Sequence, residues 1–204
     1  MKKRAILMLT ALAMAASMAA CGDKKTDETA VDSTEVAMTE AGTESTEAET
    51  ESEEVLPEGM YRSELTNELI DESLKNQRPI AVMVDNESIA LPHYGLSQAD
   101  VVYEMMNSTL NGRITRFMVL VKDWENIKQL GSIRSVRPTN ILIASEWNAV
   151  ICHDGGPFYI DEYMADPSVD NFSGTFSRVD NGKSREYTEY ILPGDLDKNF
   201  ENSG

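Results

Sequence analysis

The sequence predicts an α/β or α+β fold, in which a mixed β-sheet with flanking helices follows a disordered acidic linker. Short apolar runs of the kind that form buried strands recur from residue 80 to residue 152, and a helical pattern lies between the last two of them. The stretch 22–56, in contrast, contains no aromatic residue and little that could be buried. We therefore expect one globular α/β domain over residues 57–204.

Four strands and one helix can be placed from local patterns. The strands are expected at Ile80–Val84, Val101–Met106, Ile114–Val121 and Ala149–Cys152, because each is a short apolar run bounded by polar or turn residues. The helix is expected at Pro138–Trp147, where proline suits the first turn. Before the strands, leucine and isoleucine residues at helical spacing predict a short or frayed helix within Met60–Lys75.

The pair Asn111-Gly112 predicts a two-residue hairpin turn between the second and third strands. Such a turn would place Asn107 opposite Arg116 and Glu104 opposite Val119. Glu104 and Arg116 would then point to opposite faces of the sheet, which excludes an ion pair between them unless a bulge shifts the strand by one residue.

The first 20 residues have the layout of an export signal, with basic residues before an apolar stretch that is shorter than the roughly 20 residues of a membrane span. Met18-Ala19-Ala20-Cys21 resembles a lipobox, in which a signal peptidase cuts before the cysteine and lipid is joined to its thiol. We expect a bacterial lipoprotein with a signal peptide at 1–20. Palmitate or similar acyl chains on Cys21 would hold it on the outer, extracytoplasmic face of the cytoplasmic membrane. The alternative is an ordinary secretory signal followed by a chance cysteine.

The segment 21–56 is expected to be a disordered, lipid-anchored Thr/Glu-rich linker. Residues 23–54 contain 12 acidic residues against two lysines. Repulsion between these carboxylates extends a flexible chain, so the linker is interpreted as a spacer, with binding of calcium or of a basic partner as the alternative. The net charge of the whole chain is -17, which argues against nucleic acid as a partner.

Five motifs occur in an order that resembles one known family. They are RPIAVMVDN at 78–86, GLSQADVVYE at 95–104, ITRF at 114–117, GSIRSVRP at 131–138 and HDGG at 153–156. Together they resemble the YerB-type bacterial lipoproteins, whose domain has no known function. The resemblance covers about residues 78–160 and implies an envelope location and a lipid anchor, but no accepted reaction. It also implies a second, C-terminal domain, so we expect this chain to be truncated at its C-terminal end.

The segment before the predicted helix places Arg134, Ser135 and Arg137 together. A helix N-terminus offers free backbone N–H groups and a partial positive charge, and two guanidinium groups beside it suit a carboxylate or phosphate. We expect a non-catalytic binding or interaction domain with an anion site at these residues, assisted by Arg116 and His153. The expected partner is an envelope protein or an anionic cell-wall ligand.

Two other interpretations stay open. In one, Ser135 caps the helix and the arginines bond to the domain's own carboxylates, such as Glu104 or Asp154. In the other, the protein is a cell-wall hydrolase with Glu104 or Asp154 as general acid or base and His153 as partner. With two histidines and no HExxH or CxxC pattern, we expect no metal and no cofactor, and Cys152 is expected to be a core residue.

Overall fold

The computed structural model describes residues 55–110 and 112–203. The expected signal peptide at 1–20, the lipid attachment at Cys21 and nearly all of the expected linker lie outside the described residues. The strands are β1 (Met60–Arg62), β2 (Leu69–Asp71), β3 (Ile80–Asp85), β4 (Val101–Met106), β5 (Thr115–Val121), β6 (Leu130–Gly131), β7 (Val150–His153), β8 (Asn171–Ser173), β9 (Ser177–Arg178) and β10 (Glu189–Ile191). The α-helices are α1 (Pro138–Glu146), α2 (Asp161–Met164) and α3 (Asp195–Ser203), and two 3-10 helices used below are η4 (Trp124–Asn126) and η6 (Arg185–Tyr187).

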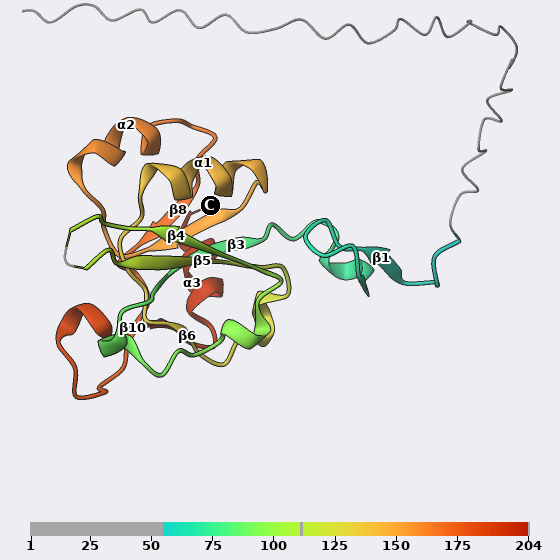
Figure 1. The fold of residues 1–204 in the computed structure, drawn as a ribbon. Helices are drawn as coiled ribbons and strands as arrows, with labels where there is room; N and C mark the ends of the chain where they lie inside the picture. The colour runs from blue at the N-terminus through green and yellow to red at the C-terminus, as the bar shows by residue number, and fades with distance from the viewer. Residues whose placement is uncertain (1–54, 111, 204) are drawn as a thin grey trace, which may run out of the picture. The chain divides into compact units, whose positions relative to one another are not determined.

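A mixed sheet of five strands, in the order β4-β5-β3-β7-β8, forms the centre of the fold (Figure 1). β5 pairs antiparallel with β3 and β4, whereas β7 pairs parallel with β3 and β8. The carboxyl ends of β3 and β7 therefore lie at the same end of the sheet, and β5 begins there. A second sheet has the order β6-β10-β9, and β1 and β2 form a separate pair.

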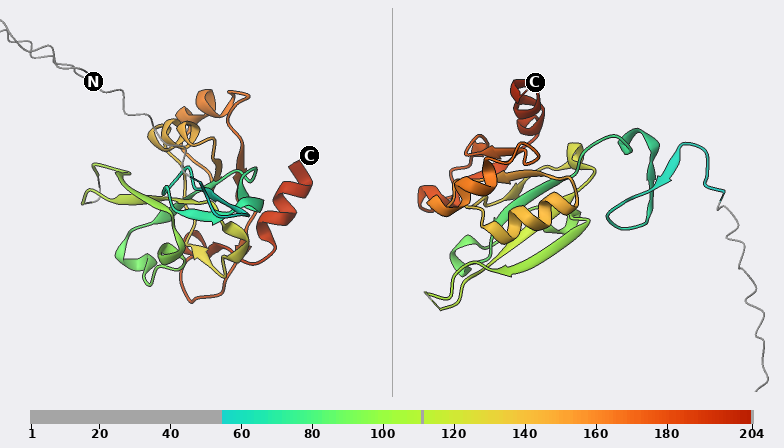
Figure 2. Two further views of the ribbon diagram at one scale, coloured as in Figure 1. Left: turned by 90° about the vertical axis from the view of Figure 1, so that its right-hand side faces the viewer. Right: turned by 90° about the horizontal axis from the view of Figure 1, so that it is seen from above.

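The central strand β3 is buried on both faces, which is why its sequence is continuously apolar. Val82 packs in one cluster with Leu196 of α3, and Met83 packs in another with Ile141 of α1. Figures 1 and 2 show α1 and α2 on one face of the central sheet, and the β6-β10-β9 sheet with α3 on the other. The structure is thus the mixed α+β fold that the sequence predicts.

The predicted helix within Met60–Lys75 is wrong, because this segment forms the β1–β2 pair and a single 3-10 turn. Asn67 has a left-handed backbone with φ of 61°, which reverses the chain inside the expected helix. Leu65 is the buried member of the apolar set, whereas Leu69 is 37% exposed. The helical spacing therefore did not correspond to a buried face.

The predicted hairpin register is wrong by two residues, since Glu104 lies opposite Phe117 and Met105 lies opposite Arg116. The N–H groups of Asn107 and Ser108 both donate to the carbonyl of Ile114, so the connection is wider than a two-residue turn. A shift by two preserves the faces of a strand. The expectation that Glu104 and Arg116 point to opposite faces is therefore confirmed.

Within the part of the chain that the structure describes, none of the helices has the length and apolar character needed to cross a membrane.

Candidate functional site

The arginines singled out from the sequence lie at the end of the central sheet where β3 and β7 finish and β5 begins. The backbone of Arg134 holds this arrangement, because its N–H donates to the carbonyl of Met83 at 2.8 Å. Its own carbonyl accepts from the N–H of Asp154 at 3.0 Å, just beyond β7. The segment before α1 is thereby fixed across the ends of both parallel strands.

Asp85 is the centre of this cluster, although it is not among the site residues predicted from the sequence. It is the last residue of β3 and is fully buried. One carboxylate oxygen accepts the N–H of Glu87 at 2.7 Å. The other, Oδ2, lies 3.1 Å from Nε of Arg134 and 3.8 Å from Nη2 of Arg116. A buried carboxylate in this position holds two guanidinium groups near one point.

Arg116, near the start of β5, is only 4% exposed. Its Nη1 donates to the carbonyl of Ser135 at 2.6 Å, while its Nε has no hydrogen-bond partner among the described residues. Burial lowers the pKa of Arg116 to about 10. The neighbouring charges of Arg134 and Arg137 lower it further, whereas the carboxylate of Asp85 acts to raise it. Burial is thus the main cause of the lowered pKa, and repulsion among the three like charges adds to it.

Arg134 is held by the 3-10 helix η6 as well as by Asp85. Its Nη1 donates to the carbonyl of Glu186 at 3.0 Å and to a carboxylate oxygen of the same residue at 2.8 Å. Its guanidinium lies over the ring of Tyr187, 4.7 Å from the centroid, in a cation–π contact. The side chain remains 16% exposed, so part of it still reaches the surface.

Arg137 precedes α1 and occupies the N-cap position, where its N–H donates to Oδ1 of Asn140 at 2.9 Å. Its guanidinium donates to the carbonyl of Val136 at 2.9 Å, and no carboxylate among the described residues pairs with it. Ser135 does not cap the helix, because its hydroxyl donates to the carbonyl of Asp154 at 2.9 Å. The interpretation of Ser135 as the N-cap is therefore wrong.

The arginines do bond to carboxylates of the domain, but not to the two named from the sequence. Asp85 and Glu186 are the acidic partners of Arg134. Glu104 instead accepts hydrogen bonds from Thr115 at 2.7 Å and Asn86 at 3.1 Å. Asp154 pairs with Arg178, which the sequence did not single out.

A second group of charges joins Asp154 to β9 and β10. Nη2 of Arg178 lies 2.9 Å from Oδ2 of Asp154 and 2.6 Å from Oε2 of Glu189. Glu189 is fully buried, and its other oxygen accepts the N–H of Phe176 at 3.2 Å. Two carboxyl groups thus share a single guanidinium nitrogen.

The pKa values of the two carboxyl groups in this cluster are shifted in opposite directions. Burial, followed by the hydrogen bond to Asp154, raises the pKa of Glu189 to about 7. Partial burial of Asp154 acts to raise its pKa, but the hydrogen bonds from Glu189 and Arg178 outweigh this and hold the pKa below its usual value. At pH values below about 7 the pair therefore holds one proton, mainly on Glu189.

His153 ends β7 and is 3% exposed. Its Nδ1 lies 2.7 Å from the carbonyl oxygen of Gly155, and its Nε2 lies 3.2 Å from Oδ1 of Asn171. Both ring nitrogens are therefore engaged. The structure brings Arg116, Arg134, Ser135 and Arg137 together, but no described contact joins His153 to Glu104 or to the carboxylate of Asp154.

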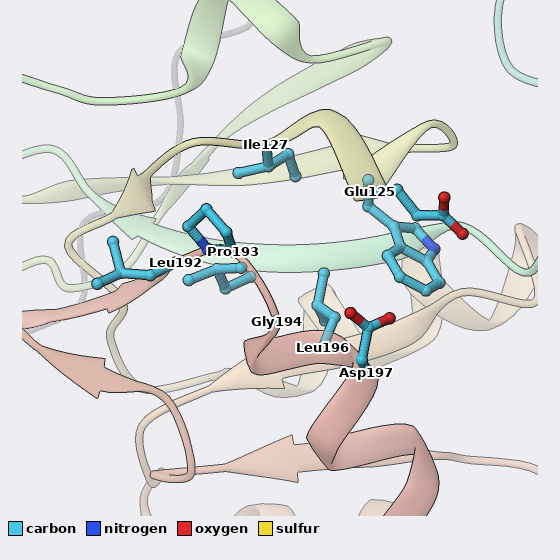
Figure 3. Close-up of a pocket in the computed structure, with 9 residues that line it drawn as sticks. Glu125, Ile127, Leu192, Pro193, Gly194, Leu196 and Asp197 are labelled. Atoms are coloured by element: carbon cyan, nitrogen blue, oxygen red, sulfur yellow. The ribbon is translucent and has the colours of Figure 1, made fainter.

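A separate pocket of about 400 Å³ lies between η4 and the start of α3 (Figure 3). It is lined by Trp124, Glu125, Ile127, Ile191, Leu192, Pro193, Gly194, Leu196 and Asp197. None of these residues is a predicted site residue, because they lie in segments without a recognised motif. No group of three or more metal-binding side chains occurs in residues 55–110 and 112–203.

Comparison with known proteins supports the resemblance. The chain is 27% identical over 137 residues to the Bacillus subtilis (strain 168) protein named "Putative lipoprotein YerB", covering 63% of this chain and 40% of that one. The crystal structure of YerB protein from Bacillus subtilis matches with a TM-score of 0.63 at 24% sequence identity, over 71% of this chain and 50% of the solved one, which shows a shared fold. The chain thus spans half or less of the relatives' length. A family model described as "Protein of unknown function (DUF3048) N-terminal domain" matches residues 65–204, and the chain belongs to this family.

Proposed function

We propose that this protein is a lipid-anchored, extracytoplasmic lipoprotein whose domain binds an anionic ligand without catalysing a reaction. The ligand site is the arginine cluster of Arg116, Arg134 and Arg137, with Ser135 beside it. The anchor is supported by the lipobox-like residues before Cys21 and by the name of the Bacillus relative. His153 contributes by fixing the loop after β7 rather than by touching the ligand, since its ring is buried.

The observation that carries the proposal is that Arg137 lies near Arg116 but has no carboxylate partner among the described residues. Three guanidinium groups interact there; Arg134 pairs with Asp85 and Glu186, and Arg116 is attracted by Asp85 and Glu87. Burial is the main cause of the lowered pKa of Arg116, and repulsion by the like charges of Arg134 and Arg137 lowers it further. An anion bound between Arg134 and Arg137 would relieve this repulsion.

The geometry fits a carboxylate or a phosphate. Arg137 has no carboxylate partner among the described residues and is partly exposed, and the side chain of Arg134 is 16% exposed. Planar guanidinium groups bind both kinds of oxyanion through paired hydrogen bonds. Asp85 and Tyr187 would hold Arg134 in place before the ligand arrives.

Isothermal titration calorimetry of the full chain with inorganic phosphate, glycerol phosphate and N-acetylalanine tests this proposal. Arg137→Gln is expected to weaken binding about tenfold, the equivalent of one charge-assisted contact. Arg113→Gln is the matched control. Arg113 is an exposed arginine in the β4–β5 connection, and its substitution removes the same charge at a position outside the proposed site. No measurable binding of any probe, or equal losses in both variants, would count against an anion site here.

A second candidate function, cell-wall hydrolysis, is favoured by the Asp154–Glu189 pair. Carboxyl groups with pKa values moved apart can act as base and acid, with Asp154 in the first role. In this hydrolase, Asp154 and Glu189 would act as the catalytic pair, in place of the pairing of His153 with Glu104 or Asp154 expected from the sequence. Glu189 is completely buried and therefore out of reach of a polymer, which favours the binding function over hydrolysis. Loss of wall-polymer turnover in Asp154→Asn, with its fold retained, would favour the hydrolase.

The proposed anchor has its own test, which is independent of the ligand. Cys21→Ser is expected to move the protein from the detergent phase to the aqueous phase in detergent partitioning and to remove the mass of the acyl chains. Cys152→Ser is the control, because a buried core cysteine cannot take part in anchoring. Unchanged partitioning of Cys21→Ser would contradict the anchor.

A further inference from the structure

The pocket of Figure 3 is independent of the arginine cluster and lies at the other end of the central sheet. Arg116 is the second residue of β5, whereas Trp124 follows the end of the same strand by three residues. A strand of this length separates its two ends by roughly 20 Å. A ligand in this pocket would therefore not contact the proposed anion site.

The pocket has an apolar floor that is formed before any ligand binds. Ile127, Ile191 and Leu196 line it and are each at most 4% exposed. Trp124 is fixed from two sides, because its indole N–H donates to the carbonyl of Arg78 at 3.1 Å and its ring stacks on Phe200 at 5.2 Å. A volume of about 400 Å³ on such a floor is suited to a side chain or a small molecule.

Two carboxylates stand beside this apolar floor. Glu125 comes from η4 and Asp197 from the first turn of α3, and both are exposed. Figure 3 shows them at one end of the pocket, with Leu192 and Pro193 toward the other end. Among the described residues, neither carboxylate has a hydrogen bond or an ion pair. The pocket thus combines an apolar half with an uncompensated negative half.

We propose that this pocket binds a lysine side chain of a partner peptide. The aliphatic stem of lysine would lie on Ile127 and Leu196, and its ammonium group would lie between Glu125 and Asp197. A compact cation on an apolar stem fits the two halves together, as lysine side chains generally bury the stem while keeping the charge at polar groups. The indole of Trp124 adds attraction for a cation. An acidic partner is disfavoured by the same two carboxylates and by the net charge of -17.

The test measures the fluorescence of Trp124 in the full chain. Trp147→Phe removes the other tryptophan, so that the remaining signal reports on the pocket. The probe is N-acetyl-lysine-N-methylamide, and its uncharged partner is N-acetyl-norleucine-N-methylamide, which has the same stem. Saturable quenching or enhancement is expected for the lysine probe, with weaker binding at high salt. Calorimetry on the chain with both tryptophans provides the same comparison if Trp147→Phe does not fold.

The double variant Glu125→Gln/Asp197→Asn is expected to weaken binding of the lysine probe tenfold or more. Glu58→Gln/Glu72→Gln is the matched control, because it makes the same change in net charge at exposed carboxylates outside the pocket. Equal affinity for the norleucine probe, equal losses in both double variants, or no binding would overturn the proposal. So would concentration-dependent dimerisation that Glu125→Gln/Asp197→Asn abolishes, since the occupant would then be a second copy of this chain.

Discussion

Oδ2 of Asp85 lies 3.1 Å from Nε of Arg134, and the carboxylate of this pair is completely buried. The two residues are 49 positions apart, and they meet because the backbone of Arg134 hydrogen-bonds to Met83, two residues before Asp85. The contact ties the segment before α1 to the end of β3. It serves the fold directly, and it also orients the guanidinium that we propose to meet the ligand.

Asp85→Asn is expected to destabilise the protein by about 3 kcal/mol or more, because removing one partner of a buried ion pair leaves the other charges uncompensated. Asparagine can still accept the N–H of Glu87, so the loss reports on charge. Urea unfolding followed by circular dichroism provides the measurement. Added phosphate should stabilise Asp85→Asn more than the native protein, since the arginine cluster would then lack its own anion.

Asp170→Asn is the matched control for this prediction. Asp170 pairs with Arg78, but its side chain is 59% exposed, so its loss should cost less than about 1 kcal/mol. Similar losses in Asp85→Asn and Asp170→Asn would show that the buried pair has no special weight.

Four of the five strands of the central sheet could be predicted from the sequence, because each is a short apolar run; β8 was not predicted. β3 is apolar at every position from Ile80 to Val84 and is buried on both faces, so no tertiary information was needed to place it. α1 begins at Pro138, as expected for proline in a first turn. The helix predicted within Met60–Lys75 was wrong, because its apolar residues have helical spacing but do not form one buried face. The left-handed Asn67 also interrupts the segment.

The candidate site could be predicted only in part. Arg134 and Arg137 were recognisable because two arginines beside a predicted helix start form a local pattern. Their acidic neighbours were not, because the positions of Asp85 and Glu186 depend on how β3, β7 and η6 come together. A signal for Asp85 did exist, namely a carboxylate that directly ends a fully apolar strand. Such a group must find a partner when the strand is buried.

Glu189→Gln is expected to flatten the pH dependence of stability between pH 5 and pH 8. The pKa of Glu189 is raised to about 7 in the folded protein, so the unfolded chain releases this proton at lower pH than the folded one does. Stability from this group is therefore full at acidic pH and falls as the pH rises toward 7. Glutamine resembles the protonated form and has nothing to release.

Calorimetric melting at pH 5, 6, 7 and 8 checks this prediction. Glu186→Gln is the control, because Glu186 is an exposed partner of Arg134 outside the Asp154–Glu189 pair. Parallel melting curves for the native protein and Glu189→Gln over the whole range would contradict the raised pKa.

Cys152 is expected to be unreactive while the protein is folded. It is completely buried in the core, and burial raises the pKa of its thiol far above the ordinary value, so that little thiolate forms. In a Cys21→Ser background, a disulfide reagent at pH 8 should label no thiol in buffer and one thiol in urea. Thr109→Cys, at an exposed position, should be labelled in both conditions. Rapid labelling of Cys152 in buffer would show that β7 opens readily.

Gly95→Ala is expected to destabilise the protein by about 2–4 kcal/mol, since two costs combine at this position. Gly95 has a φ of 81°, and a Cβ there would lie 2.6 Å from the carbonyl oxygen of Gln129 and 2.8 Å from Cδ1 of Leu130. Gly182→Ala separates the two costs, because Gly182 has a φ of 72° with nothing within 4 Å of its Cβ position. It should lose only about 1 kcal/mol, from backbone strain alone. Urea unfolding of both variants measures the difference, which is the cost of the close approach between the loop before β4 and β6. If the two variants lose the same amount, the loop moves away from β6 at little cost.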